Sequence, residues 1–105
     1  MIEKPDNWVL LSLPNDEYKV FATWAGGYLD GDSWRLNSGI KSVELEDDYY
    51  YFYGYSGSCY MCHKDSYGVA TSFGQTVLED ILEKLEGKVK LVENFKKIIN
   101  EKYKS

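Results

Sequence analysis

The run YYYFYGY at residues 49–55 constrains the fold of this chain more than any other segment. Successive side chains of a strand point to opposite faces, so the four odd-numbered tyrosines share one face, while Tyr50 and Phe52 share the other. Both faces of this strand are therefore aromatic. Tyrosine suits half-buried strands and also binding surfaces. One face is expected to join a core, and the other is either covered by helices or open to a partner.

Further strands are predicted on both sides of this run. NWVLLSL at residues 7–13 places Val9, Leu11 and Leu13 on one side and Trp8, Leu10 and Ser12 on the other, and the residues of YKVFATW at 18–24 alternate between two sides in the same way. Turn-forming residues separate the two segments, so they form a predicted hairpin. SWRLNSG is a short predicted strand. IKSVELEDD at residues 40–48 alternates so that Ile40 is expected on the same face as Glu44 and Glu46. CYMCHK continues or pairs with the aromatic strand after a bend at residues 56–58.

The last third of the chain changes to the period of a helix. Apolar residues recur every four positions through residues 73–85, a capping box begins at Ser72, and Gly87 is a typical stop. A second helix is predicted over residues 91–103, although KVKLV at its start could instead be a short strand. The predicted fold is therefore α+β: a single domain with an antiparallel sheet of about four to six strands within residues 7–70, and one or two C-terminal helices within residues 72–103 packed on one face.

The net charge of −5 argues against a general binder of phosphate backbones, which needs a basic face. It is compatible with a basic partner surface. The chain has no apolar run near the ~20 residues of a membrane span, and MIEKPDNW contains no apolar signal region. Two cysteines suit a reducing compartment. We therefore expect a cytoplasmic monomer or homodimer that binds neither a membrane nor the nucleic-acid backbone directly.

The segment CYMCH has the C-x-x-C-H spacing that attaches a c-type haem. It lies in a predicted strand and loop, however, and the chain has no second histidine to act as an axial ligand. Zinc requires four ligands, and the chain has no other cysteine or histidine. A redox dithiol would need a thiolate at a helix N-terminus. We expect two packed thiols and no cofactor, and keep as the alternative a metal or haem site at Cys59, Cys62 and His63.

Three other motifs are weaker. GYSGS nearly matches the nucleophile elbow G-x-S-x-G, and a hydrolase using Ser56 and His63 ranks last among the functional hypotheses. Residues 30–33, DGDS, resemble the opening of a calcium loop, but the closing glutamate is absent, so a tight turn is predicted. Arg35 is the only arginine. It could anchor a carboxylate or phosphate, but stacking at the edge of the core is the preferred interpretation.

The acidic residues of the 40–48 segment adjoin the aromatic strand, with Asp30 and Asp32 expected near them. No credible catalytic set accompanies them, so the favoured hypothesis is a non-enzymatic binding or inhibitor protein with a protein partner. The predicted partner-binding residues are Tyr49, Tyr51, Tyr53, Tyr55, Glu44, Glu46, Asp47 and Asp48.

Two segments, WAGGYLDGDSWRLNSGI at residues 24–40 and YGYSGSCYMCHKDSYG at residues 53–68, resemble small uncharacterised accessory proteins of tailed bacteriophages. The resemblance covers residues 20–70. It implies an early accessory protein that acts in the host cytoplasm by binding a host component. It carries over no catalytic residue.

Overall fold

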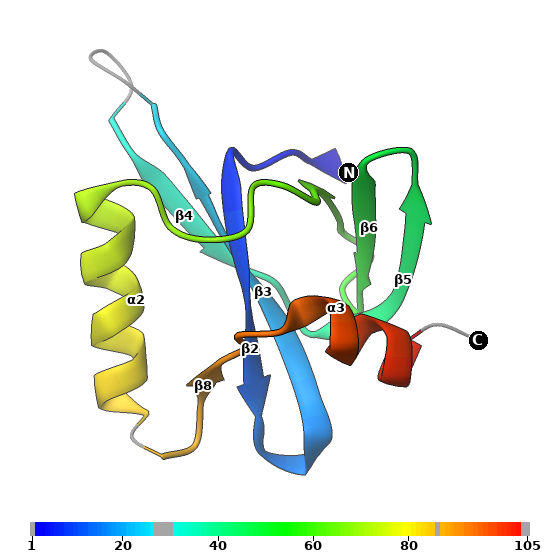
Figure 1. Cartoon of the computed structure of the whole chain (residues 1–105). Coiled ribbons are helices and arrows are strands. Elements are labelled where there is room, and N and C mark those ends of the chain that lie inside the picture. The colour runs from blue at the N-terminus through cyan, green and yellow to red at the C-terminus, as the bar shows by residue number, and fades with distance from the viewer. Residues whose placement is uncertain (1, 27–30, 86, 104–105) are drawn as a thin grey trace.

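A computed structural model of the chain describes residues 2–26, 31–85 and 87–103, and Asp30 of the predicted turn lies outside these ranges. The described residues form eight strands and four helical segments, and three of these segments lie in the C-terminal third of the chain. The α+β class is therefore confirmed (Figure 1). The strands are β1 (Ile2–Glu3), β2 (Asn7–Leu13), β3 (Glu17–Trp24), β4 (Ser33–Leu36), β5 (Ile40–Glu46), β6 (Tyr49–Gly54), β7 (Cys59–His63) and β8 (Lys90–Leu91). The helical segments are η1 (Pro14–Asp16), α2 (Ser72–Lys84), α3 (Phe95–Ile98) and η2 (Ile99–Tyr103).

The strands divide between two sheets of four strands each. We call the sheet ordered β1-β7-β6-β5 the aromatic sheet, and the sheet ordered β4-β3-β2-β8 the central sheet. All neighbouring strands are antiparallel except β1 and β7, which are parallel. The division reflects burial: β2 and β3 are apolar on both faces, so the central sheet needs a covering layer on each side.

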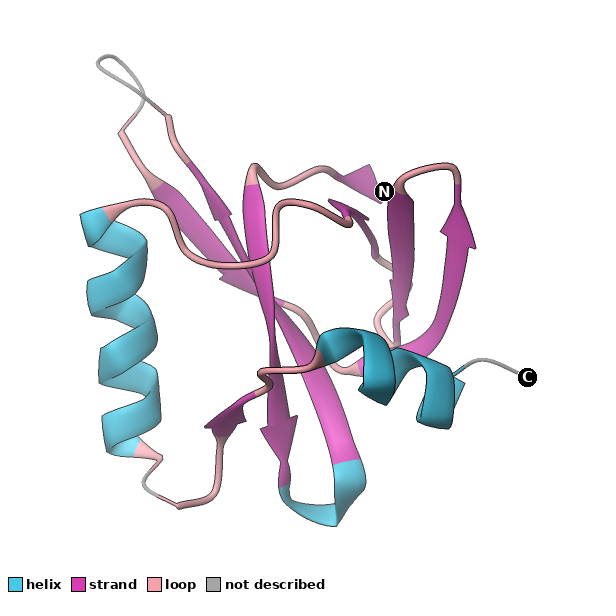
Figure 2. Ribbon diagram, in the orientation of Figure 1, coloured by secondary structure: helices cyan, strands magenta, loops and turns pink. Residues whose placement is uncertain are grey.

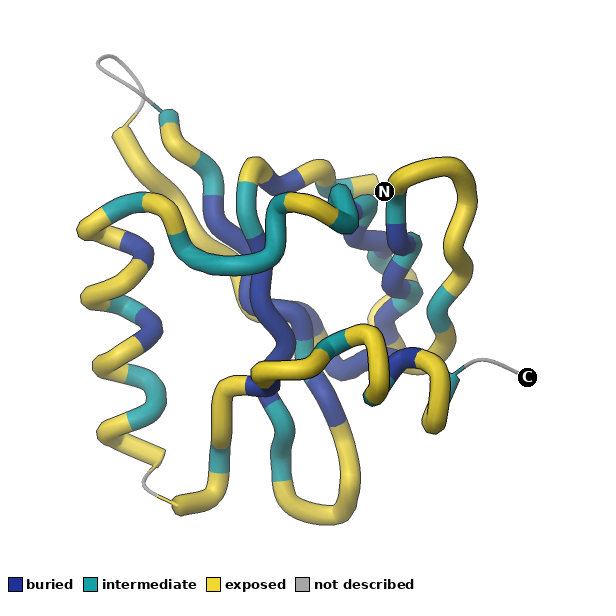
Figure 3. The backbone as a smooth tube through the Cα atoms, in the orientation of Figure 1, coloured by how far each residue is buried: buried dark blue, intermediate teal, exposed yellow. Residues whose placement is uncertain are grey.

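The central sheet lies between α2 and the aromatic sheet (Figure 2). On one face, Val9 and Phe21 pack with Leu78 of α2. On the other, Trp8 and Leu10 join a larger core with residues of the aromatic sheet, including Phe52, Tyr60 and Cys62. The predicted alternation of NWVLLSL is thus correct, and Figure 3 shows the middle of β2 and β3 buried, with their ends less so.

The β2–β3 hairpin is confirmed, with pairs running from Asn7 opposite Thr23 to Leu13 opposite Glu17. Its turn is the short helix η1, in which Asn15 has a φ of 68°. Asparagine tolerates this left-handed conformation better than most residues, because its short polar side chain can bond to the local backbone.

The chain passes from the central to the aromatic sheet at Asn37, between β4 and β5. The backbone N–H of Asn37 donates to the Val20 carbonyl (3.0 Å), and its side-chain Oδ1 accepts from the N–H groups of Val20 (2.8 Å) and Gly39 (3.3 Å). Asn37 is buried, so these bonds are shielded from water. They tie the crossover to β3 and thereby fix where β5 begins.

A bulge at the start of β5 changes one predicted orientation. Ile40 pairs with Gly54, but Ser42 already pairs with Tyr53, so one extra residue stands on β5. Ile40 therefore points into the core instead of sharing the outer face with Glu44 and Glu46. The prediction for Ile40 was wrong because simple alternation does not continue through a bulge.

The C-terminal third follows the predicted helical period with two differences. The N-cap of α2 is Thr71, whose hydroxyl accepts from the Gly74 N–H at 3.0 Å, one residue before the predicted cap at Ser72. KVKLV contributes the short strand β8, so the second helix begins only at Phe95. α3 and η2 then cross the open end between the two sheets, where Ile99 enters the larger core (Figure 1).

The crossover at Asn37 predicts a stability effect. Asn37→Ala should lower the free energy of unfolding by about 1–3 kcal/mol, because the buried Val20 N–H loses its acceptor. Urea denaturation followed by circular dichroism measures this. Ser38→Ala is the matched control, since it removes only an exposed bond from the Ser56 N–H. Equal stability of Asn37→Ala and the control would show that the side-chain bonds do not hold the crossover.

Candidate functional site

The outer face of the aromatic sheet collects most of the predicted partner-binding residues. On β6, Tyr50 and Phe52 point into the core, so Tyr49, Tyr51 and Tyr53 point outward. Strand pairing places each outward tyrosine in a row across three strands. We call this surface the tyrosine face, and its rows from β5 through β6 to β7 are Glu46–Tyr49–His63, Glu44–Tyr51–Met61 and Ser42–Tyr53–Cys59.

The described part of the chain places no helix over the tyrosine face. α2 lies beyond the central sheet, and α3 with η2 packs on the inner side of the aromatic sheet (Figure 2). Each of the three tyrosines is half-buried. Their rings therefore rest against row neighbours while part of each ring remains in contact with solvent, which suits an aromatic surface available for binding.

Carboxylate, imidazole and ammonium groups surround the tyrosine rings. The Tyr53 hydroxyl donates to Oε2 of Glu44 at 3.3 Å, and desolvation, followed by the Glu44 charge, raises the pKa of Tyr53. His63 meets the Tyr49 ring edge-on, with centroids 5.0 Å apart. Lys4 Nζ lies 5.0 Å from the same Tyr49 centroid, within cation–π range. The face thus combines neutral phenols, carboxylates and one ring that already holds a cation.

The remaining predicted acids lie at one end of this surface. Asp47 and Asp48 form the two-residue turn between β5 and β6, where Asp47 has a φ of 56°. Asp48 pairs with Lys64 at 3.2 Å. Asp32 does not join them: its neighbours Gly31 and Ser33 line a hollow with Glu3 of β1, at the edge of the aromatic sheet opposite β5.

Tyr55 is not part of the tyrosine face. β6 ends at Gly54, and the Gly57 N–H donates to the Gly54 carbonyl to close a turn around Tyr55. The Tyr55 N–H donates to the Gly39 carbonyl at 3.3 Å, and the Tyr55 ring lies against Gly39, the residue before β5. The alternation used to group Tyr55 with the other tyrosines stops where the hairpin turns.

The C-x-x-C-H residues do not converge on one site. Cys59 and Cys62 are three positions apart on β7, so their sulfur atoms lie on opposite faces of the strand. Cys62 is fully buried in the core, whereas Cys59 and His63 belong to the tyrosine face. Both cysteines are free thiols. Within the described residues, no three histidine, cysteine or acidic side chains are grouped to hold a metal ion.

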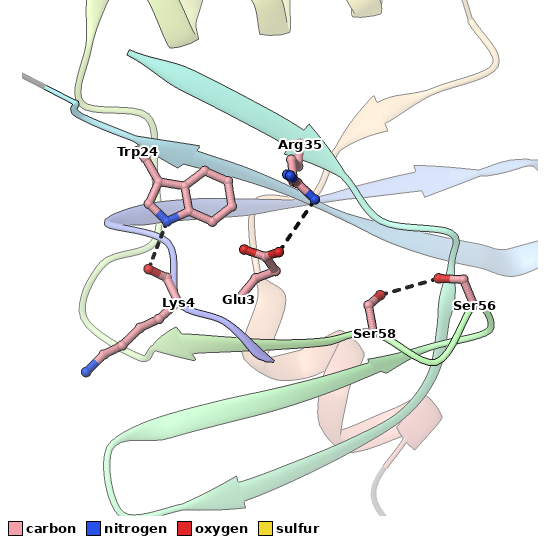
Figure 4. Close-up of polar contacts among 6 residues, drawn as sticks. All are labelled: Glu3, Lys4, Trp24, Arg35, Ser56 and Ser58. Atoms are coloured by element: carbon pink, nitrogen blue, oxygen red, sulfur yellow. Dashed lines mark hydrogen bonds and ion pairs between the residues drawn. The ribbon is translucent and has the colours of Figure 1, made fainter. Parts of the chain in front are cut away.

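Ser56 and His63 stand at opposite ends of the β6–β7 hairpin. Ser56 lies in the turn that precedes β7, and His63 is the last residue of β7, opposite Tyr49. The five-residue strand separates them by more than about 13 Å at 3.3 Å per residue. The Ser56 hydroxyl instead contacts that of Ser58 at 3.4 Å (Figure 4), and His63 Nδ1 accepts from the Asp65 N–H at 3.0 Å. A hydrolytic pair of Ser56 and His63 is therefore wrong.

Arg35 links the two sheets at the edge opposite β5. Its Nη1 lies 3.5 Å from Oε1 of Glu3, so the ion pair joins β4 of the central sheet to β1 of the aromatic sheet (Figure 4). Nearby, the Trp24 indole N–H donates to the Lys4 carbonyl at 3.0 Å. At the edge of the core, Trp34 stacks on Phe21, with ring centroids 5.7 Å apart. Trp34 thus takes the stacking role that was predicted for Arg35.

Sequence reasoning missed two members of the tyrosine face. Met61 lies between Cys59 and His63 on the same strand, and simple alternation along β7 was a sufficient signal for it. Lys4 carried no comparable signal, because its position over Tyr49 depends on the parallel pairing of β1 with β7.

The positions of the two cysteines predict their reactivity. Burial raises the pKa of both thiols, and that of Cys62 rises well above its ordinary value. In the native protein at neutral pH, both should react with Ellman's reagent much more slowly than in urea, and Cys62 should be the slower. Cys59→Ser and Cys62→Ser variants assign the two rates. Rapid reaction of both, or a Cys59–Cys62 disulfide after mild oxidation, would contradict their placement on opposite faces.

No helix in the described part of the chain is long and apolar enough to cross a membrane. Comparison of the chain with family models, with curated proteins and with solved structures found no match. The chemistry and geometry of the tyrosine face are therefore the basis for inferring a function.

Proposed function

We propose that this chain is a non-enzymatic binding protein of the cytoplasm that recognises a basic surface of a protein partner through the tyrosine face. The observation that carries the proposal is the set of three rows of the tyrosine face. Tyr49 and Tyr51 stand opposite Glu46 and Glu44 of β5, and Tyr53, which stands opposite Ser42, donates a hydrogen bond to Glu44. A phage accessory protein that acts on a host component would use such a surface in this way.

Tyrosine is well suited to this task. A tyrosine side chain offers a large contact area and loses little rotamer freedom when it is covered by a partner. Here the backbone of a central strand holds the three rings, so little further ordering is needed on binding. Tyr51 lies in the middle row of the face, and Tyr53 in the next row is bonded to Glu44, so these two rings are the expected centre of the binding energy.

The charges of the face favour a cationic partner. Glu44 and Glu46 lie beside the rings, with Asp47 and Asp48 at the end of the same surface, and the whole chain carries a net charge of −5. Lys4 over Tyr49 is an internal example of the contact that a partner's lysine or arginine would make. Such a charge pattern speeds association with a basic protein and repels phosphate backbones. Because salt screens the attraction between exposed charges, the affinity for the basic partner should fall as the salt concentration rises.

The surface is a sheet face without a paired nucleophile and base, which favours binding over catalysis. A chain bound to the partner's basic surface would prevent other molecules from binding there. In this way it would inhibit the partner. Two free, buried thiols support a reducing cytoplasm.

Replacing both Tyr51 and Tyr53 by alanine should weaken binding without unfolding the protein. The partner is first identified by affinity capture with the wild-type chain, and its Kd is then measured by calorimetry. We expect a loss of about 2 kcal/mol or more, roughly 30-fold in Kd, if these rings are the centre of the interface.

Tyr55→Ala is the matched control, because Tyr55 is 64% exposed but lies outside the face. Its Kd should stay near that of the wild-type chain. Circular dichroism checks the fold of every variant. Unchanged binding by the double variant, an equal loss in the Tyr55 control, or unfolding of the double variant would each count against the proposal.

A further inference from the structure

β5 is the edge strand of the aromatic sheet that borders the tyrosine face. It pairs with β6 on one side, and no strand of the described residues pairs with its other side. β5 has seven residues, whereas the opposite edge strand β1 has two. An edge of this length presents a row of backbone N–H and C=O groups that can accept another strand.

The two faces of β5 differ in chemistry. Its outer side carries Glu44 and Glu46 beside the tyrosines. Its inner side carries Val43 and Leu45, and Leu45 is 52% exposed although it points toward the core side. Figure 3 shows β5 as the most exposed strand of this sheet.

A small cavity lies on the inner side, beside this edge. Val43 and Leu45 of β5 line it together with Tyr50, Ile99 and Asn100, and its volume is about 50 Å³. η2 forms its far wall. The cavity and the exposed Leu45 together offer an apolar site next to the unpaired backbone, so a strand added to β5 could bury a small apolar side chain there.

We propose that an extended segment of the partner adds to β5 as a further strand, with lysine or arginine at alternate positions and apolar residues between them. The basic side chains lie on the outer face beside Glu44 and Glu46, and the apolar ones on the inner face beside Leu45 and the cavity. Backbone bonds to the edge supply affinity, and the alternate side chains supply specificity. This inference rests on the proposed function and states how the partner binds.

A second copy of this chain fits the edge poorly. Pairing of β5 with β5 of another copy would place the outer side chains of both strands together, and the last three outer positions are Ser42, Glu44 and Glu46. Carboxylates facing carboxylates across a strand pair are destabilising. The same acids attract lysine and arginine, so charge selects a basic segment over self-association.

The test uses a synthetic peptide of alternating lysine and valine, titrated into isotope-labelled protein and followed by NMR. The peptide should shift the amide signals of β5 and slow their hydrogen exchange. A peptide with glutamate in place of lysine should not bind. Glu44→Gln together with Glu46→Gln should weaken binding by about threefold to tenfold, because two cross-strand charge pairs are lost.

N-methylation of the peptide tests the backbone pairing. Alternate N–H groups of a strand point to opposite edges, so methylating the lysine nitrogens or the valine nitrogens blocks only one edge. One of the two methylated peptides should lose binding, and the other should retain it. Equal effects of the two methylations, or no binding of the unmodified peptide, would overturn the inference.

The two proposals fail in different ways. If Tyr51→Ala with Tyr53→Ala weakens the natural partner while the methylated peptides behave alike, the tyrosine face is the binding surface and strand addition is wrong. If the peptide adds to β5 but those tyrosine variants bind the natural partner normally, the proposed function is wrong.

Discussion

The indole of Trp8 is the contact on which the arrangement of the two sheets depends. Trp8 is fully buried on β2, and its N–H donates to the His63 carbonyl of β7 at 2.7 Å. Its ring meets four other aromatic rings with centroids 4.8 to 6.1 Å away: Tyr50, Phe52, Tyr67 and Phe95. One side chain thus joins the central sheet, the aromatic sheet and α3. Removing so large a buried group typically costs several kcal/mol.

The position of Trp8 decides which tyrosines are available for binding. Because Trp8 fills the space between the sheets, it fixes Tyr50 and Phe52 as the inner residues of β6. Alternation then sends Tyr49, Tyr51 and Tyr53 outward. β6 therefore contributes side chains both to the core and to the tyrosine face. The packed core beneath holds the outer rings in place, which lowers the entropy that binding must overcome.

Local alternation in the sequence was sufficient for much of this account. It predicted the two faces of β2 and the β2–β3 hairpin, and it grouped Tyr49, Tyr51 and Tyr53 on one face of β6 and Glu44 with Glu46 on one face of β5. Alternation alone did not decide which face of β6 points outward. Alternation failed where the backbone departs from a regular strand, at the bulge that turns Ile40 inward and at the turn that removes Tyr55.

Long-range pairing was beyond the reach of the sequence. The division into two sheets depends on which strands meet Trp8, and Lys4 reaches Tyr49 only because β1 pairs with β7. The C-x-x-C-H segment shows the opposite case. Its spacing suggests a ligand site, yet in a strand the same spacing sends Cys59 and Cys62 to opposite faces. A sequence motif can form a ligand site only if the backbone conformation brings its side chains together.

The most direct measurement is photo-CIDNP NMR, in which an excited dye polarises the signals of solvent-accessible tyrosine rings. An open tyrosine face requires polarised signals from Tyr51 and Tyr53 and none from the buried Tyr50 and Tyr60. Strong polarised signals from Tyr50 would mean that the inner and outer faces of β6 are reversed. The absence of polarised signals from Tyr51 and Tyr53 in the free protein would mean that the outer face is covered. Either result would contradict the account.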